Sequence, residues 1–196
     1  MNESNMWKQT DEEILQQIPE KLLTWYDKNA RVLPWREDPR PYRVWVSEIM
    51  LQQTRVEAVK PYFERFLKAL PTVEDLAQAP EEQLLKLWEG LGYYNRVRNL
   101  QRGARAVMAE HGGVIPASFE ALKKLPGIGD YTAGAIGSIA FQIPVPAVDG
   151  NVLRVISRVL YRRDNILDAK VKRRIEGEIK EILPERTGDF NQSLME

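Results

Sequence analysis

The sequence has no cysteine and a single histidine, His111. Without cysteine, the chain's own residues can form no disulfide, zinc–thiolate site, cysteine nucleophile or cysteine-ligated iron–sulfur cluster. One histidine cannot build a histidine-based metal site by itself. We therefore exclude thiol and redox chemistry by these residues and expect no cofactor within this chain.

Long apolar runs and an excess of charge of either sign are also missing. The longest apolar stretch, 44–51, is interrupted by polar residues and is far shorter than a bilayer span, and the first residues are polar and acidic rather than signal-like. The 28 Lys plus Arg residues balance the 28 Asp plus Glu residues. Since 43% of the 196 residues are hydrophobic, we expect one or two folded domains. With neither a span nor a signal-like start, we expect the protein inside the cell, in the cytoplasm or nucleoid if it is bacterial, with no membrane partner.

Strict alternation of apolar and polar residues is absent as well, whereas apolar spacings of three and four recur between capping residues. This pattern predicts an all-α fold, with 29–42 as a loop. The predicted helices are one from Pro19, 44–53, 56–67, a short one capped by Thr72, one from Pro80 to Gly90 or Gly92, 93–111, one from Ser118, 131–141 capped by Asp130, 151–161 capped by Asp149, 171–183, and a last one from Asp189.

The last predicted helix runs for only one or two turns before Glu196. We expect it to have no cap and no partner for its apolar side, as in a chain truncated before its natural end. The proline-rich segment 143–146 is the best candidate for a crossing between two lobes.

The balanced charge is unevenly distributed. Segment 151–174 holds eight basic and two acidic residues, and 96–105 holds four arginines and no acid. Acidic residues concentrate near the first helix and after Ile175. Because local potential rather than net charge attracts phosphate, this distribution predicts one basic side and leaves nucleic acid open as a partner.

A glycine-rich turn, LPGIGD at 125–130, lies between two predicted helices. Gly127 and Gly129 permit a tight turn and a close backbone approach, and the following helix start presents unpaired N–H groups. Such a turn can hold a backbone phosphate without a lysine. The glycines could equally serve only the turn of an αα-hairpin, because short glycine motifs are weak signals.

The hairpin, with the Gly/Pro-rich segment and aspartate after it, resembles the helix-hairpin-helix of base-excision DNA glycosylases. The resemblance extends over nearly the whole chain, to MutY-type adenine DNA glycosylases. Four spaced motifs carry it: LPWR at 33–36, VSEIMLQQT at 46–54, WEGLGYY at 88–94 and DGNV at 149–152.

The resemblance implies a six-helix lobe at 33–145, with the hairpin at about 118–141, and a second, incomplete helical lobe formed by 1–32 and 146–196. It implies a monomer that binds double-stranded DNA between the lobes and removes adenine mispaired with 8-oxoguanine or guanine. Family members usually continue into a four-cysteine [4Fe–4S] loop and a domain that reads 8-oxoguanine, and both are absent from this sequence.

Glu48 has Val44, Trp45 and Leu51 as neighbours on its helix face, so its carboxyl is expected to point into apolar surroundings with a raised pKa. By position alone, an exposed or ion-paired helix glutamate would be the ordinary interpretation. The resemblance implies that Glu48 is the general acid that protonates a flipped adenine.

Asp149 is predicted to cap the following helix, and the resemblance adds a second role: stabilising the oxocarbenium ion or attacking it covalently. Asn151 and Tyr131 would hydrogen-bond around Asp149. At the position of Tyr131, endonuclease III relatives carry a lysine that attacks the sugar. Tyrosine therefore predicts a monofunctional enzyme, with an endonuclease III-like pyrimidine-lesion glycosylase and a noncatalytic DNA-binding module as alternatives.

The remaining roles come from the resemblance alone. The adenine pocket is implied to be lined by Trp35, Arg36, Leu51 and Gln192. DNA contacts are implied for Gln53, Thr54, Leu91, Tyr93, Gly127, Gly129 and Tyr131, with Gln53 and Tyr93 wedging into the duplex. The backbone carbonyls of Lys123, Leu125 and Ile128 resemble a site for a structural monovalent cation.

Overall fold

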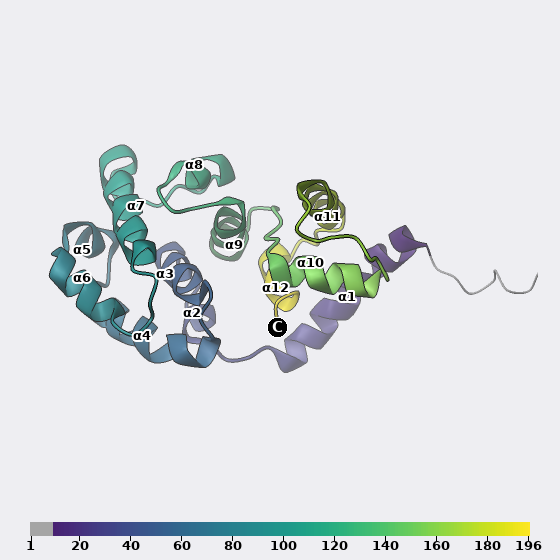
Figure 1. The fold of residues 1–196 in the computed structure, drawn as a ribbon, viewed down its shortest axis with the longest axis horizontal. Coiled ribbons are helices and arrows are strands. Elements are labelled where there is room, and N and C mark those ends of the chain that lie inside the picture. The colour runs from purple at the N-terminus through teal and green to yellow at the C-terminus, as the bar shows by residue number, and fades with distance from the viewer. Residues whose placement is uncertain (1–9) are drawn as a thin grey trace, which may run out of the picture.

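A computed structural model describes residues 10–196, and within that range the chain is all-helical, as predicted, with no strand (Figure 1). The helices are α1 Asp11–Asn29, α2 Pro34–Glu37, α3 Pro41–Leu51, α4 Val56–Ala69, α5 Val73–Gln78, α6 Glu81–Trp88, α7 Asn95–His111, α8 Phe119–Lys124, α9 Asp130–Phe141, α10 Gly150–Val159, α11 Ala169–Glu181 and α12 Thr187–Ser193. No helix in this range is both long enough and apolar enough to span a bilayer.

Three of the predicted caps are confirmed. Thr72, Ser118 and Asp149 each accept a hydrogen bond from a backbone N–H in the first turn of the helix that follows. Such bonds satisfy N–H groups that have no partner within the helix. The local sequence therefore sets the starts of α5, α8 and α10.

The predicted start of the first helix at Pro19 is wrong. Helix α1 begins at Asp11, because Thr10 and Glu13 form a reciprocal capping box, and Pro19 lies inside the helix. Similarly, Gly129 rather than Asp130 occupies the cap position of α9. Asp130 instead pairs with Lys123 at 2.6 Å and so links the first turn of α9 to α8.

Two further boundaries differ from the prediction. The segment 29–42, expected to be a loop, contains the short helix α2, which Pro34 begins at a position where its missing N–H is not needed. Helix α12 begins at Thr187, and Asp189 lies in its first turn rather than capping it.

The buried apolar residues form two clusters. The first draws on 33–147 and is centred on Trp45, Phe63, Phe66 and Trp88, each fully buried. The second combines Leu15 with residues of 148–194. Figure 1 shows the same grouping, with α2–α9 on one side and α1, α10, α11 and α12 on the other. The chain passes from one cluster to the other between Ala147 and Val148.

The expectation that the last helix lacks a partner is wrong. Helix α12 packs against both α1 and α9, and Phe190 is fully buried in the second cluster. Asn191, also fully buried, accepts a hydrogen bond from Ala147 N at 3.2 Å. Its Nδ2 donates to Val145 O at 3.0 Å and to Ser138 Oγ at 2.9 Å. One polar side chain of α12 therefore fixes the crossing segment against α9.

Close approach of the crossing segment to α9 depends on a glycine. A Cβ atom at Gly134 would lie 2.2 Å from the Pro146 carbonyl oxygen, a distance that no real Cβ tolerates. The absent side chain lets the backbone of 146–147 lie directly on α9. This contact sets the path of the chain into Asp149, the first residue after the crossing that faces the site.

Candidate active site

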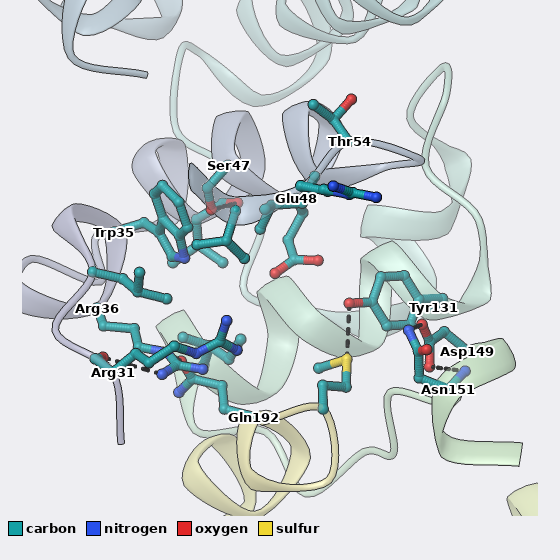
Figure 2. A pocket seen from close by; sticks show the side chains of 17 residues that line it. Arg31, Trp35, Arg36, Ser47, Glu48, Thr54, Tyr131, Asp149, Asn151 and Gln192 are labelled. Carbon is teal, nitrogen blue, oxygen red and sulfur yellow. Dashed lines mark hydrogen bonds between the residues drawn. The ribbon is translucent and has the colours of Figure 1, made fainter. Parts of the chain in front are cut away.

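A pocket of about 260 Å³ lies where the two clusters meet (Figure 2). Its walls come from the 31–36 segment, α3 and the residues after it, α9, the start of α10, and α12. The lining residues are Arg31, Leu33, Trp35, Arg36, Val44, Ser47, Glu48, Leu51, Thr54, Arg55, Val56, Tyr131, Ile139, Asp149, Asn151, Gln192 and Met195. The fold thus brings together all of the predicted catalytic and base-pocket residues from positions up to 157 residues apart.

Glu48 lies on α3, 7% exposed, with its carboxyl directed into the pocket (Figure 2). Burial raises the pKa of Glu48 from 4.5 to about 7. The nearby Tyr131 hydroxyl lowers this pKa, the charge of Asp149 raises it, and the positive charge of Arg36 lowers it. Near neutral pH this carboxyl therefore exists in both protonation states, as a proton donor and acceptor requires.

Tyr131 is the second residue of α9 and faces Glu48 across the pocket (Figure 2). Its hydroxyl donates to Met195 Sδ at 3.3 Å rather than to Asp149, which corrects the predicted contact. Burial, and then the charges of Glu48 and Asp149, raise the pKa of Tyr131 well above 10. Tyr131 is consequently a neutral hydrogen-bond donor in the site.

Asp149 caps α10 and has both oxygens engaged. Oδ1 accepts from Asn151 N at 2.8 Å and Val152 N at 2.9 Å, and Oδ2 accepts from Asn151 Nδ2 at 2.8 Å. The contact predicted between Asn151 and Asp149 is therefore present. These bonds hold the Asp149 carboxyl in a fixed orientation at the edge of the pocket.

The opposite side of the pocket contains a network around Arg36. Its Nε donates to Gln192 Oε1 at 2.9 Å, its Nη2 to Glu196 Oε2 at 2.8 Å, and its guanidinium lies 5.4 Å from the centre of the Tyr26 ring. Burial would raise the pKa of Glu196, but hydrogen bonds from Arg31 and Arg36 bring it to about 2. The network holds Arg36 and Gln192 in one arrangement facing the pocket.

Several pocket residues were not identified from the sequence. Met195 follows Gln192 by three positions, just beyond the C-cap of α12, so this spacing could have placed it on the same face. Ser47 precedes Glu48, but its hydroxyl donates to Val44 O at 2.8 Å within α3. For Arg31 and Glu196 no sequence signal existed, because their contact joins residues 165 positions apart.

The hairpin between α8 and α9 borders the pocket, because Tyr131 lies in the first turn of α9, directly after the hairpin turn, and also lines the pocket. Gly127 adopts a left-handed φ of +81°, and a Cβ there would lie 2.8 Å from Asn99 Cβ. At Gly129, by contrast, a Cβ would meet nothing within 4 Å. Gly127 is thus required by the turn itself, whereas the absent side chain of Gly129 leaves open space beside the N-terminus of α9.

One family model, described as HhH-GPD superfamily base excision DNA repair protein, matches residues 46–181, which include the hairpin and Asp149. The chain belongs to this superfamily. Adenine DNA glycosylase of Rattus norvegicus is 48% identical to the HhH-GPD chain over an alignment of 185 residues. The alignment covers 89% of this chain and 36% of the relative. The Homo sapiens enzyme is also 48% identical, over 89% of this chain and 34% of its own.

The HhH-GPD chain thus spans about a third of the length of these relatives, which confirm the resemblance to adenine DNA glycosylases. A solved thermostable thymine-DNA glycosylase matches its fold with a TM-score of 0.83 and 27% identity, over 93% of this chain and 85% of that one. An endonuclease III trapped in a DNA covalent intermediate shares the fold, with a TM-score of 0.78 and 24% identity over 96% and 85% of the chains. The predicted helix-hairpin-helix glycosylase fold is confirmed.

The residues predicted to contact DNA divide into two groups in the HhH-GPD chain. Gln53 is exposed and Tyr93 is 66% exposed, so both are accessible to a duplex. Leu91 is only 7% exposed and belongs to the first cluster, so its side chain is not available for the predicted contact. Leu91 lies between Gly90 and Gly92, which have left-handed φ values of 100° and 71°.

The carbonyls predicted to bind a cation have free acceptor capacity. Leu125 O accepts from Ile128 N at 3.1 Å, while in the described part of the chain Lys123 O and Ile128 O accept no hydrogen bond outside the helices. Carbonyl oxygens are ligands that suit hard cations. The same part of the chain holds no group of three or more His, Cys, Asp or Glu residues that could bind a metal, and the cysteine-free sequence offers no thiolate for an iron–sulfur cluster.

Proposed function

We propose that this chain catalyses the hydrolytic removal of adenine mispaired with 8-oxoguanine or guanine in double-stranded DNA, and that it acts as a monomer. The observation that carries the proposal is Glu48: a buried carboxyl with a pKa of about 7, facing a pocket that also contains Asp149. A carboxyl that is half protonated at neutral pH suits proton transfer to a leaving group. The adenine DNA glycosylases among the relatives supply the choice of base.

In the proposed reaction, adenine leaves the base stack and enters the pocket beside Trp35, Leu51, Arg36 and Gln192. Protonated Glu48 donates its proton to a ring nitrogen of adenine, and the bond between the base and C1′ of the sugar breaks. Asp149 stabilises the resulting oxocarbenium ion or adds to it. Water then attacks C1′ and gives a proton to the Glu48 carboxylate, so that the products are free adenine and an abasic site.

DNA would lie between the two clusters, which we propose correspond to one lobe at 33–145 and a second lobe formed by 1–32 and 146–196; residues 1–9 lie outside the described range. The first lobe contains eight helices, α2–α9, rather than the predicted six, because several of them are short. Gln53, Thr54 and Tyr93 would contact the duplex near the target base. A monovalent cation on the carbonyls of Lys123, Leu125 and Ile128 would brace the hairpin, supplying positive charge but no chemistry. Part of the basic surface is already neutralised, since Arg162 pairs with Asp11 and Glu178.

The proposal predicts base release without strand cleavage, because Tyr131 cannot form the Schiff base that a lysine forms there. Single-turnover assays on duplexes with adenine opposite 8-oxoguanine should give strand breaks only after alkali, and borohydride should trap little covalent complex. Abundant trapping would favour an endonuclease III-like enzyme. Binding without base release would favour a noncatalytic DNA-binding module and would overturn the proposal.

The hairpin gives a separate prediction about DNA binding. Because Gly129 has open space around it, Gly129→Ala should fold as well as the wild type yet weaken duplex binding about tenfold, as its methyl group would hold the backbone N–H groups away from a phosphate. Fluorescence anisotropy with a labelled duplex measures the affinity, and thermal unfolding measures the stability. Gly177→Ala adds a methyl group in equally open space on α11 and is the control. Equal affinities of the two variants would show that the turn holds no phosphate.

A further inference from the structure

Two exposed loops each carry a residue in a backbone conformation that side chains disfavour. Gln53, after α3, has a φ of 57°, and Tyr93, before α7, has a φ of 49°. A residue other than glycine in the left-handed region costs free energy and persists only where its surroundings enforce it. Both residues therefore depend on something that holds their loops.

One side chain contacts both loops. The Nη1 atom of Arg96 donates to Ile49 O at 3.0 Å and to Met50 O at 3.1 Å, at the end of α3, and also to Gln52 O. These carbonyls lie at the C-terminus of a helix, where the helix dipole favours a cation. The guanidinium therefore caps α3 and fixes the backbone directly before Gln53.

The other arm of the same guanidinium holds the second loop. Nη2 of Arg96 donates to Leu91 O at 3.1 Å and to Gly92 O at 3.3 Å, and it also contacts Thr54 Oγ1 at 3.4 Å. The Cζ atom of Arg96 lies 5.5 Å from the ring centre of Tyr93. Because the group is planar and rigid, bonds on its two arms fix the position of one loop relative to the other.

We propose that Arg96 is a positioning residue that couples the loops of Gln53 and Tyr93, so that the two side chains enter the duplex as a single wedge. The inference rests on the proposed function, in which these two residues contact DNA around the flipped base. Inserting a wedge costs unstacking energy, and a preassembled pair avoids ordering two loops separately. Lysine keeps the charge but cannot bridge the loops, because its three N–H donors are all on one nitrogen atom, whereas those of arginine are spread over a planar fork.

The test is a double-mutant cycle on single-turnover adenine release. We expect Arg96→Lys to slow release from a duplex about 30-fold or more, and Tyr93→Ala to have little further effect, less than threefold, in the Arg96→Lys background. Independent roles would instead multiply the two effects. Arg102→Lys, at an exposed position on the same helix, is the control and should stay within twofold of the wild type.

A second measurement needs binding but no chemistry. With 2-aminopurine in place of the target adenine, fluorescence reports unstacking, and Arg96→Lys should lose most of the increase seen with the wild type while its thermal unfolding temperature stays within a few degrees. Should Arg96→Lys not fold, the cycle is run with Gln53→Ala and Tyr93→Ala, whose combined effect should be smaller than the product of the two single effects if the side chains act as one wedge. A folded Arg96→Lys protein that unstacks 2-aminopurine normally would overturn the inference. A wild type that releases no adenine would overturn the proposed function. The fluorescence measurement would still show whether Arg96 is needed for the Gln53 and Tyr93 loops to unstack the target base.

Discussion

Glu48→Gln is expected to abolish adenine release while making the folded protein more stable above neutral pH. Glutamine cannot donate an acidic proton to the leaving base, so we expect the single-turnover rate to fall by at least a thousandfold. The stability gain follows from the same burial that suits Glu48 to catalysis, because at high pH the wild type must keep a charge in an apolar pocket.

The direction of the pH dependence follows from the raised pKa. Glu48 has a pKa of about 7 in the folded protein and 4.5 as its ordinary value, so between these values the folded state binds more protons than the unfolded state. Its contribution to stability is therefore present at low pH and is lost as the pH rises through 7. A shift of this size corresponds to about 3 kcal/mol at pH 8, which Glu48→Gln should recover.

Denaturant unfolding at pH 5 and pH 8 measures this effect. The difference in unfolding free energy between Glu48→Gln and the wild type should be larger at pH 8, whereas Glu64→Gln, an exposed glutamate on α4, should show no such change. Wild-type base release should fall about tenfold per pH unit well above pH 7. A Glu48→Gln protein that releases adenine at the wild-type rate would exclude Glu48 as the acid.

Asp149→Asn is expected to slow adenine release a hundredfold or more without loosening the fold. Asparagine is as good a helix cap as aspartate, and its oxygen can still accept from Asn151 N and Val152 N. The amide of Asn151 can rotate to face the new NH₂ group, and in doing so it gives up one exposed hydrogen bond from Arg154. What the substitution removes is the negative charge beside the oxocarbenium ion, and groups that stabilise developing charge contribute about 10²–10³ in rate.

The control for this variant is another aspartate cap far from the pocket. Asp168 caps α11 and accepts from Lys170 N at 2.7 Å, so Asp168→Asn makes the same chemical change without touching the site. Single-turnover rates and thermal unfolding should be measured for both variants. If both variants retain the wild-type rate, Asp149 has no role beyond capping α10; if Asp149→Asn alone unfolds at a lower temperature, the loss of rate would have a structural origin.

The predictions that succeeded rested on short-range physics or on motifs. Caps such as Thr72 and Ser118 satisfy N–H groups within three residues, so the local sequence is sufficient to identify them. The apolar face around Glu48 on α3 correctly indicated a buried carboxyl with a raised pKa. The start of α1 differs from the predicted Pro19 because the reciprocal capping box of Thr10 and Glu13 begins the helix earlier, and the helix accommodates Pro19 in its interior.

Besides the helix boundaries, the predictions that failed concerned contacts between distant segments. The hydroxyl of Tyr131 donates to Met195, 64 positions away, instead of Asp149. Helix α12 packs against α1 and α9 and buries Phe190 in the second cluster, which no local pattern in its seven residues could show.

The sequence by itself determined that this chain folds into helices, that it carries a glycine hairpin, and that its own residues offer no thiolate. Those properties follow from residue types and their spacing. The tertiary structure alone decided that Glu48 meets Tyr131 and Asp149 in one pocket, and that Arg96 joins two loops. Both results depend on burial, since removing these groups from water sets the pKa of Glu48 and gives the hydrogen bonds of a charged side chain their strength.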